Sequence, residues 1–173
     1  LREERAPTMT STSDTATATD ITSVFVAGPF WALVDVDTGT VSGSARDRIE
    51  SVLSHYDAKG ATVYNAHRRE AWGAAMLEPH QFTKLDYDEI AASDVVVGFP
   101  GVPASPGTHV EIGWASAMGK PMVLLLEEGV EYAGLVEGLP SFRPCELLRF
   151  SGRVDTGALD QAVTRVVARA AEL

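Results

Sequence analysis

Short apolar runs alternate with helical patterns along most of the chain. Five runs have the length and composition of β-strands: "SVFVAG" (23–28), "ATVYNA" (61–66), "DVVVGFP" (94–100), "PMVLLLE" (121–127) and "CELLRF" (145–150). The third run is continuous and β-branched, as expected of a strand that is buried on both faces. All five are far shorter than the roughly 20 apolar residues that span a bilayer, so we expect no membrane segment.

Helical patterns fill the intervals between these runs. We expect one helix at residues 45–59, where Gly60 ends the pattern, and a helical stretch at residues 68–93 in two pieces, because "EPH" interrupts it. Further helices are predicted from Thr108, near residues 130–138 and from about Thr156. Strands that alternate with helices in this way form a parallel sheet with helices on both faces. The sequence therefore predicts a doubly wound α/β domain with a five-stranded parallel sheet.

The first 20 residues differ from the rest of the chain. They are rich in Ser, Thr, Ala and charged residues, and they hold too little apolar surface to drive folding. We expect residues 1–20 to be a disordered tail, with Met9 as the candidate natural start, and residues 21–173 to form a single domain. A basic start followed by an apolar stretch is absent from these residues, so no signal peptide is expected.

The formal net charge of −10 limits the classes of partner. Nucleic acid polymers are bound through many cationic contacts, so an acidic chain is not expected to bind them. A mononucleotide needs only a local cluster of donors and stays open. Cys145 is the only cysteine, which fits a reducing, cytoplasmic compartment. The four histidines show no metal-ligand spacing, so no metal is expected.

Ligands in doubly wound sheets bind beyond the carboxyl ends of the strands. The loops at those ends read "AGPFW", "NAHRRE", "FPGVPASPG" and "LLEEG". The third loop matches neither the GxGxxG nor the P-loop pattern, which excludes dinucleotide chemistry and ATP hydrolysis. It still enters a helix whose free backbone N–H groups can hold an anion. Ser105 and Gly107 are therefore phosphate candidates, and an ordinary Pro/Gly turn is the alternative interpretation.

Glu111 is the first acidic side chain after this loop, and two interpretations compete for it. In the first, Thr108 caps the helix and Glu111 reaches back to it as a capping box. In the second, Glu111 is a nucleophile in the first helical turn, where the helix dipole stabilises its ionised form. A carboxylate there can attack a sugar carbon and form a glycosyl ester.

Asp86 lies four residues after Phe82 and four before Ile90, so the three share one helix face. A carboxylate on a core-facing stripe is costly to bury without a partner, and a perturbed pKa often marks a functional site. We interpret Asp86 as functional; the alternative places it at the boundary of the helix's apolar face. Asp88 points elsewhere and is predicted to be solvated or a secondary hydrogen-bond partner.

The loop after the first strand carries a rigid Gly28–Pro29 turn beside three aromatic residues, Phe25, Phe30 and Trp31. Aromatic faces near a strand end suit a flat heterocyclic base, and they suit a protein core equally well. The pattern by itself leaves both interpretations open.

The loop after the second strand carries one histidine and two arginines. His67 is interpreted either as a polar contact to a ligand hydroxyl or as a satisfied loop residue. Arg68 or Arg69 can bind phosphate, and an arginine pair is also typical of a solvated surface. The phosphate candidates are thus Gly28, Arg68, Ser105 and Gly107.

Taken in order, "VFVAGPF", "LDYDEIAASDVVVGF" and "SPGTHVEIGWASAMGKP" resemble the nucleoside 2-deoxyribosyltransferase superfamily. The stretches "TVYNAHRREAWGA" and "FPGVPASPGTHVEIGWASAMGKPMVLLLE" are most similar to the cytidine-monophosphate (CMP) and hydroxymethyl-CMP N-glycosidases of blasticidin S and mildiomycin biosynthesis. The resemblance spans about residues 23–150. It implies a flavodoxin-like fold and a homodimer or larger assembly whose active sites share residues across the interface.

The resemblance also implies roles for individual residues. Glu111 matches the nucleophile, Asp86 matches an aspartate that assists departure of the base, and Ser105 matches a phosphate-contacting serine. The loop after the first strand matches the segment that holds base and sugar. A tyrosine common elsewhere in the superfamily is Phe25 here. The hydroxymethyl-CMP enzyme has an arginine where this chain has Trp31, which favours plain cytosine as the base.

The resemblance therefore implies hydrolysis of the N-glycosidic bond of CMP to cytosine and ribose 5-phosphate, in cytosine-nucleoside antibiotic biosynthesis, without a cofactor. The alternatives are a nucleoside 2-deoxyribosyltransferase, a deoxynucleotide N-hydrolase and a non-enzymatic nucleotide sensor. A cytokinin-type phosphoribohydrolase is disfavoured, because "SPGTHVE" lacks the double glycine of the "PGGxGTxxE" segment.

Overall fold

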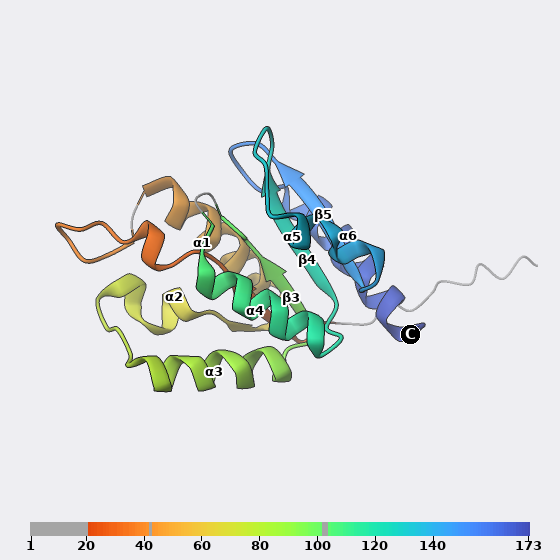
Figure 1. Cartoon of the computed structure of the whole chain (residues 1–173), viewed down its shortest axis with the longest axis horizontal. Helices are drawn as coiled ribbons and strands as arrows, with labels where there is room; N and C mark the ends of the chain where they lie inside the picture. Colours follow the sequence, from red (N-terminus) through yellow and green to blue (C-terminus); the bar gives the residue numbers. More distant parts are fainter. Residues whose placement is uncertain (1–20, 42, 102–103) are drawn as a thin grey trace, which may run out of the picture.

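A five-stranded parallel sheet forms the centre of the molecule (Figure 1). The computed structural model describes residues 21–41, 43–101 and 104–173, and the predicted tail at 1–20 lies outside these residues. The strands are β1 (Ser23–Ala27), β2 (Thr62–Tyr64), β3 (Val95–Gly98), β4 (Met122–Glu127) and β5 (Cys145–Phe150). Their order across the sheet is β2-β1-β3-β4-β5, which is a flavodoxin-like order. The predicted doubly wound, flavodoxin-like α/β fold is confirmed.

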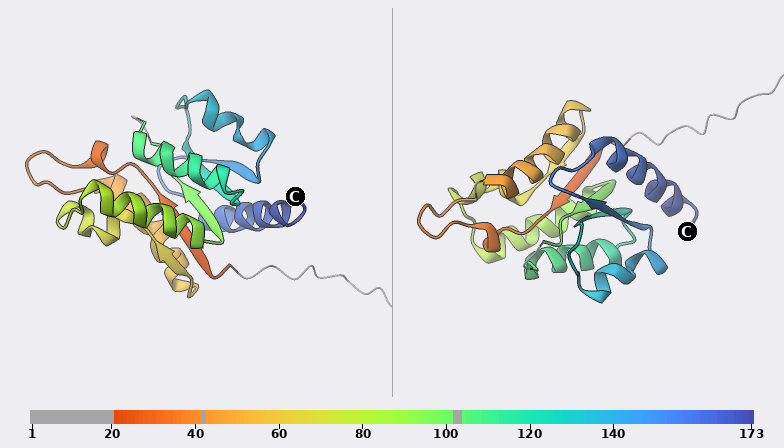
Figure 2. Two further views of the ribbon diagram at one scale, coloured as in Figure 1. Left: turned by 60° about the horizontal axis from the view of Figure 1, so that its bottom comes forward. Right: turned by 90° about the horizontal axis from the view of Figure 1, so that it is seen from above.

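Helices cover both faces of this sheet (Figure 2). One face packs against α1 (Gly43–Ala58) and α6 (Thr156–Ala171), and the other against α3 (Pro79–Ala92), α4 (Pro106–Ala117) and α5 (Gly134–Gly138). Because strand side chains alternate in direction, Val24 and Val26 face the first layer while Phe25 faces the second. The loops after β1 and β3 leave the sheet at the carboxyl ends of these strands, where doubly wound folds bind ligands.

Phe25 belongs to the hydrophobic core. Its side chain is 0% exposed and lies in the same apolar cluster as Ile90, Val96 and Ile112. The core interpretation of this residue therefore holds. A direct contact between Phe25 and a ligand, as predicted from the sequence, is not compatible with this position.

Two helices begin at prolines, and both starts differ from those predicted from the hydrophobic periodicity. The α4 helix starts at Pro106 with Ser105 as its N-cap, two residues before the predicted start. The α3 helix starts at Pro79, so the "EPH" segment opens this helix. Proline suits the first helical turn because the N–H that it lacks would have no partner there. Before α3, the chain forms α2 (Ala66–Arg69) and a 3-10 turn (Ala71–Gly73).

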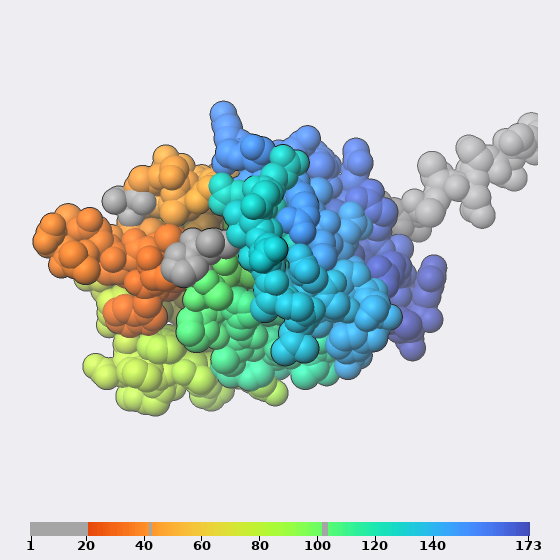
Figure 3. Space-filling model, turned by 45° about the horizontal axis from the view of Figure 1, so that its top comes forward, coloured from red at the N-terminus to blue at the C-terminus, as the bar shows by residue number. Residues whose placement is uncertain are grey.

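The segment after β1 was not predicted to be ordered. It forms a 3-10 turn (Trp31–Leu33), and an isolated antiparallel bridge joins Val34 to Val41. Residues 31–41, orange in Figures 1 and 3, project from one end of the molecule. This projection begins at Trp31, beside the carboxyl end of β1. None of the described helices is long and apolar enough to cross a membrane.

Candidate active site

A cavity of about 300 Å³ lies at the carboxyl ends of β1 and β3. This is the switch point of the strand order, where doubly wound folds bind ligands. Its walls come from the loop after β1, from the segment between α2 and α3 together with α3 itself, and from the N-terminus of α4. Its volume falls at the lower end of the range for small-molecule sites. Seven predicted site residues line it: Gly28, Phe30, Trp31, Asp86, Ser105, Gly107 and Glu111.

Glu111 projects into this cavity from the second turn of α4. The capping-box interpretation is wrong, because Ser105 is the N-cap and its Oγ accepts from the backbone N–H of Thr108 at 3.5 Å. The first-turn prediction is also wrong, since α4 starts at Pro106. Burial, followed by repulsion from Asp86, raises the pKa of Glu111 well above its usual value. The site therefore holds a carboxyl group that resists ionisation until a ligand or a cation compensates its charge.

Asp86 lies on the buried face of α3, as its spacing predicted, and is 7% exposed. Its Oδ1 accepts a hydrogen bond from Arg69 Nη2 at 2.7 Å. Burial raises the pKa of Asp86, and the Arg69 guanidinium opposes that rise. Arg69 also donates to Glu89 at 2.8 Å and contacts Glu70 at 3.4 Å. One guanidinium thus contacts three carboxylates, of which Asp86 and Glu70 line the cavity and Glu89 does not. Repulsion from Asp86 also raises the pKa of Glu111.

Sequence reasoning missed Glu70 and did not separate Arg69 from Arg68. Glu70 is 2% exposed and lines the cavity from the C-terminal end of α2. Arg68 turns the other way and forms ion pairs with Glu50 and Asp57 of α1. Neighbouring helical residues point about 100° apart, so only one arginine of the pair faces this site. Arg68 is therefore corrected from a phosphate candidate to a surface ion-pair residue.

Asp88 also lies away from the cavity. It pairs with Lys84 one helical turn earlier, at 2.5 Å, on the exposed side of α3. This position does not support the predicted role of Asp88 as a secondary hydrogen-bond partner in substrate binding, and it agrees with the prediction that Asp88 is solvated.

His67 packs against the loop after β1 and supports it. It is 1% exposed, its Nε2–H donates to the Pro29 carbonyl at 2.9 Å, and its Nδ1 accepts from Asn65 Nδ2 at 3.2 Å. Its ring stacks on Phe30 with centroids 4.7 Å apart. Burial lowers the pKa of His67 to about 4, so the ring is neutral near pH 7. Of the two interpretations of His67, the satisfied loop residue holds and the ligand contact does not, since both ring nitrogens are bonded and the ring packs against Phe30.

Gly28 lies where the loop passes closest to this support. A Cβ at this position would lie 3.2 Å from Ile49 Cδ1 and 3.4 Å from His67 Cε1. Both distances are tight for a side chain, so glycine lets the loop pack directly on its support. The backbone of Gly28 therefore forms part of the cavity wall.

The N-terminus of α4 forms the third wall. Ser105 and Gly107 line the cavity there, next to Thr108, which sequence reasoning did not select. Thr108 is 1% exposed, and its Oγ1 has no hydrogen-bond partner within the described residues. Free N–H groups and the helix dipole favour an anion at such a position. The unpaired hydroxyl adds a donor at the same place, so this wall is suited to phosphate.

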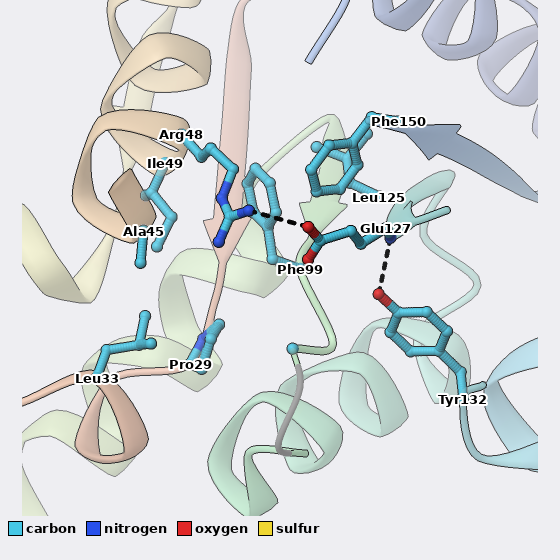
Figure 4. Close-up of a pocket in the computed structure, with 11 residues that line it drawn as sticks. Pro29, Leu33, Ala45, Arg48, Ile49, Phe99, Leu125, Glu127, Tyr132 and Phe150 are labelled. Atoms are coloured by element: carbon cyan, nitrogen blue, oxygen red, sulfur yellow. Dashed lines mark hydrogen bonds and ion pairs between the residues drawn. The ribbon is translucent and has the colours of Figure 1, made fainter. Parts of the chain in front are cut away.

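Pro29 lines a second, smaller cavity of about 60 Å³ on the other side of β1 (Figure 4). Arg48 and Glu127 form an ion pair across it at 3.4 Å, and Tyr132 Oη accepts from the Glu127 backbone N–H at 2.7 Å. This volume is too small for a nucleotide. Pro29 therefore shapes the loop between the two cavities and does not line the larger one.

Solved structures give relatives of this chain. BlsM, in its solution structure, is 43% identical with a TM-score of 0.70, over 88% of this chain and 93% of BlsM. The CMP N-glycosidase BcmB of Clostridium botulinum is 35% identical with a TM-score of 0.56, over 80% of this chain and 96% of BcmB. A conserved protein from Enterococcus faecalis V583, 18% identical with a TM-score of 0.53 over 87% of this chain and 99% of that one, shares the fold. No family model and no curated protein matches the chain.

The flavodoxin-like fold, its switch-point cavity and the similarity to BlsM and BcmB together show that the chain is an N-glycosidase. The sequence identity with BlsM and BcmB, over most of each chain, is high enough to identify the family. The chain belongs to the family of the blasticidin-type CMP N-glycosidases. The resemblance predicted from the sequence is confirmed.

Proposed function

We propose that this enzyme hydrolyses the N-glycosidic bond of CMP and releases cytosine and ribose 5-phosphate. The observation that carries the proposal is the meeting of Glu111, Asp86 and the α4 N-terminus in one cavity of about 300 Å³. A nucleophile, a proton donor and an anion site are then within reach of one nucleotide. The relationship to BcmB, a CMP N-glycosidase, supports CMP as the substrate.

The proposed reaction has two steps. In the first, the Glu111 carboxylate bonds to C1′ of the ribose while the bond from C1′ to N1 of cytosine breaks, and the bonding electrons leave with the base. Asp86, directly or through water, gives the departing base a proton. In the second, water bonds to C1′, the ester to Glu111 breaks, and the proton of the water returns to Asp86. Both carboxyl groups then regain their starting states.

The electrostatics of the site leave one proton shared by this pair of carboxyl groups. Without a nucleotide, Glu111 holds that proton because its pKa is raised further, so the proposed mechanism requires nucleotide binding to move the proton to Asp86. The mechanism needs one ionised carboxyl group and one protonated carboxyl group at the same pH. Burial raises the pKa of both Asp86 and Glu111, and the charge of Asp86 adds to the rise at Glu111. Two neighbouring carboxyl groups of this kind do not ionise together easily, so they retain one proton between them. Arg69 opposes both rises and keeps the pair within reach of ionisation.

For the base and the sugar we propose the wall formed by Phe30 and Trp31. Their ring centroids lie 6.2 Å apart, and Trp31 is 66% exposed at the rim. A flat base that binds against these rings covers apolar surface. Trp31 carries no charge to pair with a 5-hydroxymethyl group, so we propose a preference for unmodified cytosine.

We further propose that residues 21–173 act as a single domain in a cytoplasmic homodimer in cytosine-nucleoside antibiotic biosynthesis. Apolar surface next to the cavity supports the dimer: Tyr87 and Trp114 pack edge to face at 5.5 Å, and Val110 is 50% exposed. The free, buried Cys145 suits a reducing compartment. Light scattering of the purified chain measures the oligomeric state, and a monomer at micromolar concentration would contradict the dimer.

The substrate proposal is tested with four compounds: CMP, dCMP, 5-hydroxymethyl-CMP and cytidine. We expect chromatography to show free base most rapidly from CMP. Cytidine should react more slowly because it cannot use the anion site. Transfer of the sugar to an added free base would identify a transferase. Tight CMP binding without any released base would identify a nucleotide sensor.

The phosphate site gives a separate prediction at Thr108. Thr108→Val keeps the shape of the side chain and removes the unpaired hydroxyl. A hydrogen bond to a charged group contributes about 1.5–3 kcal/mol, so we expect kcat/KM for CMP to fall about tenfold and that for cytidine to change less than about twofold. Thr164→Val, on the exposed side of α6, is the matched control. Equal losses for CMP and cytidine would show that the hydroxyl supports the fold instead of the phosphate.

A further inference from the structure

Glu70 is a buried carboxylate in the cavity wall that the mechanism above does not use. It ends α2, is 2% exposed and lines the cavity together with Asp86. Its Oε2 accepts from the backbone N–H of Leu77 at 3.2 Å, and its Oε1 lies 3.4 Å from Arg69 Nη2. The first distance lies at the upper end of the ordinary N–H···O range, and the second lies beyond it.

The two contacts leave the carboxylate of Glu70 incompletely satisfied. An ionised carboxylate has about four acceptor sites, and the charge is costly to bury unless it is well bonded. A neutral side chain such as glutamine could accept the hydrogen bond from Leu77 equally well, so this bond does not explain why residue 70 is a glutamate. The Glu70 carboxylate therefore keeps free acceptor sites in the cavity wall, where a ligand can use them.

The position of Glu70 relative to the rest of the site indicates which part of a nucleotide it meets. Phosphate at the α4 N-terminus and C1′ at Glu111 occupy one side of the cavity under the proposed function. The base then extends toward the wall of α2 and α3. Arg69 Nη2 contacts both Asp86 and Glu70, at 2.7 and 3.4 Å, so these two carboxylates are neighbours on that wall.

We propose that Glu70 accepts a hydrogen bond from the 4-amino group of cytosine and so selects cytosine over uracil. This inference rests on the proposed function. Cytosine carries an N–H₂ donor at position 4, which a glutamate accepts, whereas uracil presents a carbonyl oxygen there. With uracil, the carbonyl oxygen at position 4 would face the Glu70 carboxylate, and both groups are acceptors. The carboxylate would then stay unpaired and would repel uracil. Sites built around a hydrogen bond reject analogues that lack the donor strongly.

The test measures binding by calorimetry in a Glu111→Gln background, so that it does not depend on catalysis. The ratio of the Kd for UMP to the Kd for CMP is compared with and without Glu70→Gln. We expect the ratio to fall at least about tenfold, because a pair of this kind is worth about 1–3 kcal/mol of discrimination. Glu89→Gln is the matched control, since Glu89 also pairs with Arg69 but does not line the cavity. Its ratio should stay within about twofold of the background.

Each other outcome contradicts the inference. An unchanged ratio, equal weakening of both nucleotides, or the same change in Glu89→Gln would assign Glu70 a structural role only. No measurable CMP binding to the background variant overturns it too. If Glu70→Gln does not fold, the background variant is titrated with the pyrimidin-2-one nucleotide, which lacks the 4-amino group. We expect it to bind at least about tenfold more weakly than CMP, and equal binding overturns the inference.

The two proposals fail in different ways. The four-compound assay on the unchanged chain decides the reaction, and the binding ratio decides the role of Glu70. A chain that prefers CMP to UMP through Glu70 but releases no base would retain this inference and lose the proposed hydrolysis.

Discussion

Glu111→Gln is expected to reduce the release of cytosine from CMP by on the order of 10³-fold or more, as the loss of a catalytic nucleophile does. The amide matches the carboxylate in size and cannot form the glycosyl ester. Chromatographic assay of cytosine measures the loss. Glu89→Gln is the matched control, because Glu89 pairs with Arg69 outside the cavity and its pKa is also raised by burial. A Glu111→Gln enzyme within tenfold of the parent would remove the proposed nucleophile.

The same variant is expected to be more stable than the parent at neutral pH. The pKa of Glu111 is raised in the folded state above its usual 4.5. Between these two values the folded chain binds more protons than the unfolded chain, so stability falls as pH rises through that window. Glutamine removes this cost. The gain in Tm over the parent should be largest near pH 7.5 and should shrink as pH falls toward 4.5; a gain independent of pH would contradict the shifted pKa.

Hydrophobic periodicity predicted the doubly wound α/β class, whereas the flavodoxin-like fold was implied by the family resemblance. All five strands follow apolar runs, and α6 begins at Thr156 as expected. The helix starts were less accurate because a proline and a cap decide them locally. Ser105 caps α4 two residues before the expected start, and Pro79 opens α3. Hydrophobic periodicity predicts which face of a helix is buried, but it predicts poorly at which residue the helix begins.

That two-residue difference changes the physical explanation of Glu111. Its position at the cavity was correctly predicted, yet both local explanations, the capping box and the helix dipole, depended on a first-turn position. In the structure the dominant effect is burial, and it acts in the opposite direction on the pKa. Asp86 was predicted more securely, because spacing of four residues from Phe82 and Ile90 directly sets the face that it occupies.

The remaining site residues depend on contacts between distant elements. The four-residue helix α2 is too short for periodicity to show whether Arg68 or Arg69 turns toward α3. The importance of Glu70 follows from its burial, and that of Thr108 from its missing hydrogen-bond partner. Neither property can be derived from one sequence, because each depends on what packs against the side chain.

Asp86→Asn tests the proposed proton donor. The amide can still accept the hydrogen bond from Arg69, so we expect the fold to be retained. It has no acidic proton to give, and we expect kcat for CMP to fall by about 10²–10⁴-fold, the usual size of general acid catalysis. Asp88→Asn is the matched control on the same helix, because Asp88 is exposed and pairs with Lys84.

Two further measurements separate proton donation by Asp86 from a purely structural role. With 5-fluorocytidine 5′-monophosphate, whose base departs with less help from an acid, the loss in Asp86→Asn should be at least about tenfold smaller than with CMP. The basic limb of the kcat/KM profile should also disappear. In the proposed mechanism the active enzyme has Asp86 protonated, so the parent loses activity as Asp86 ionises with rising pH, and the asparagine variant has no such proton to lose. Equal losses on both substrates with an unmoved basic limb would show that Asp86 acts only by holding Arg69 in place.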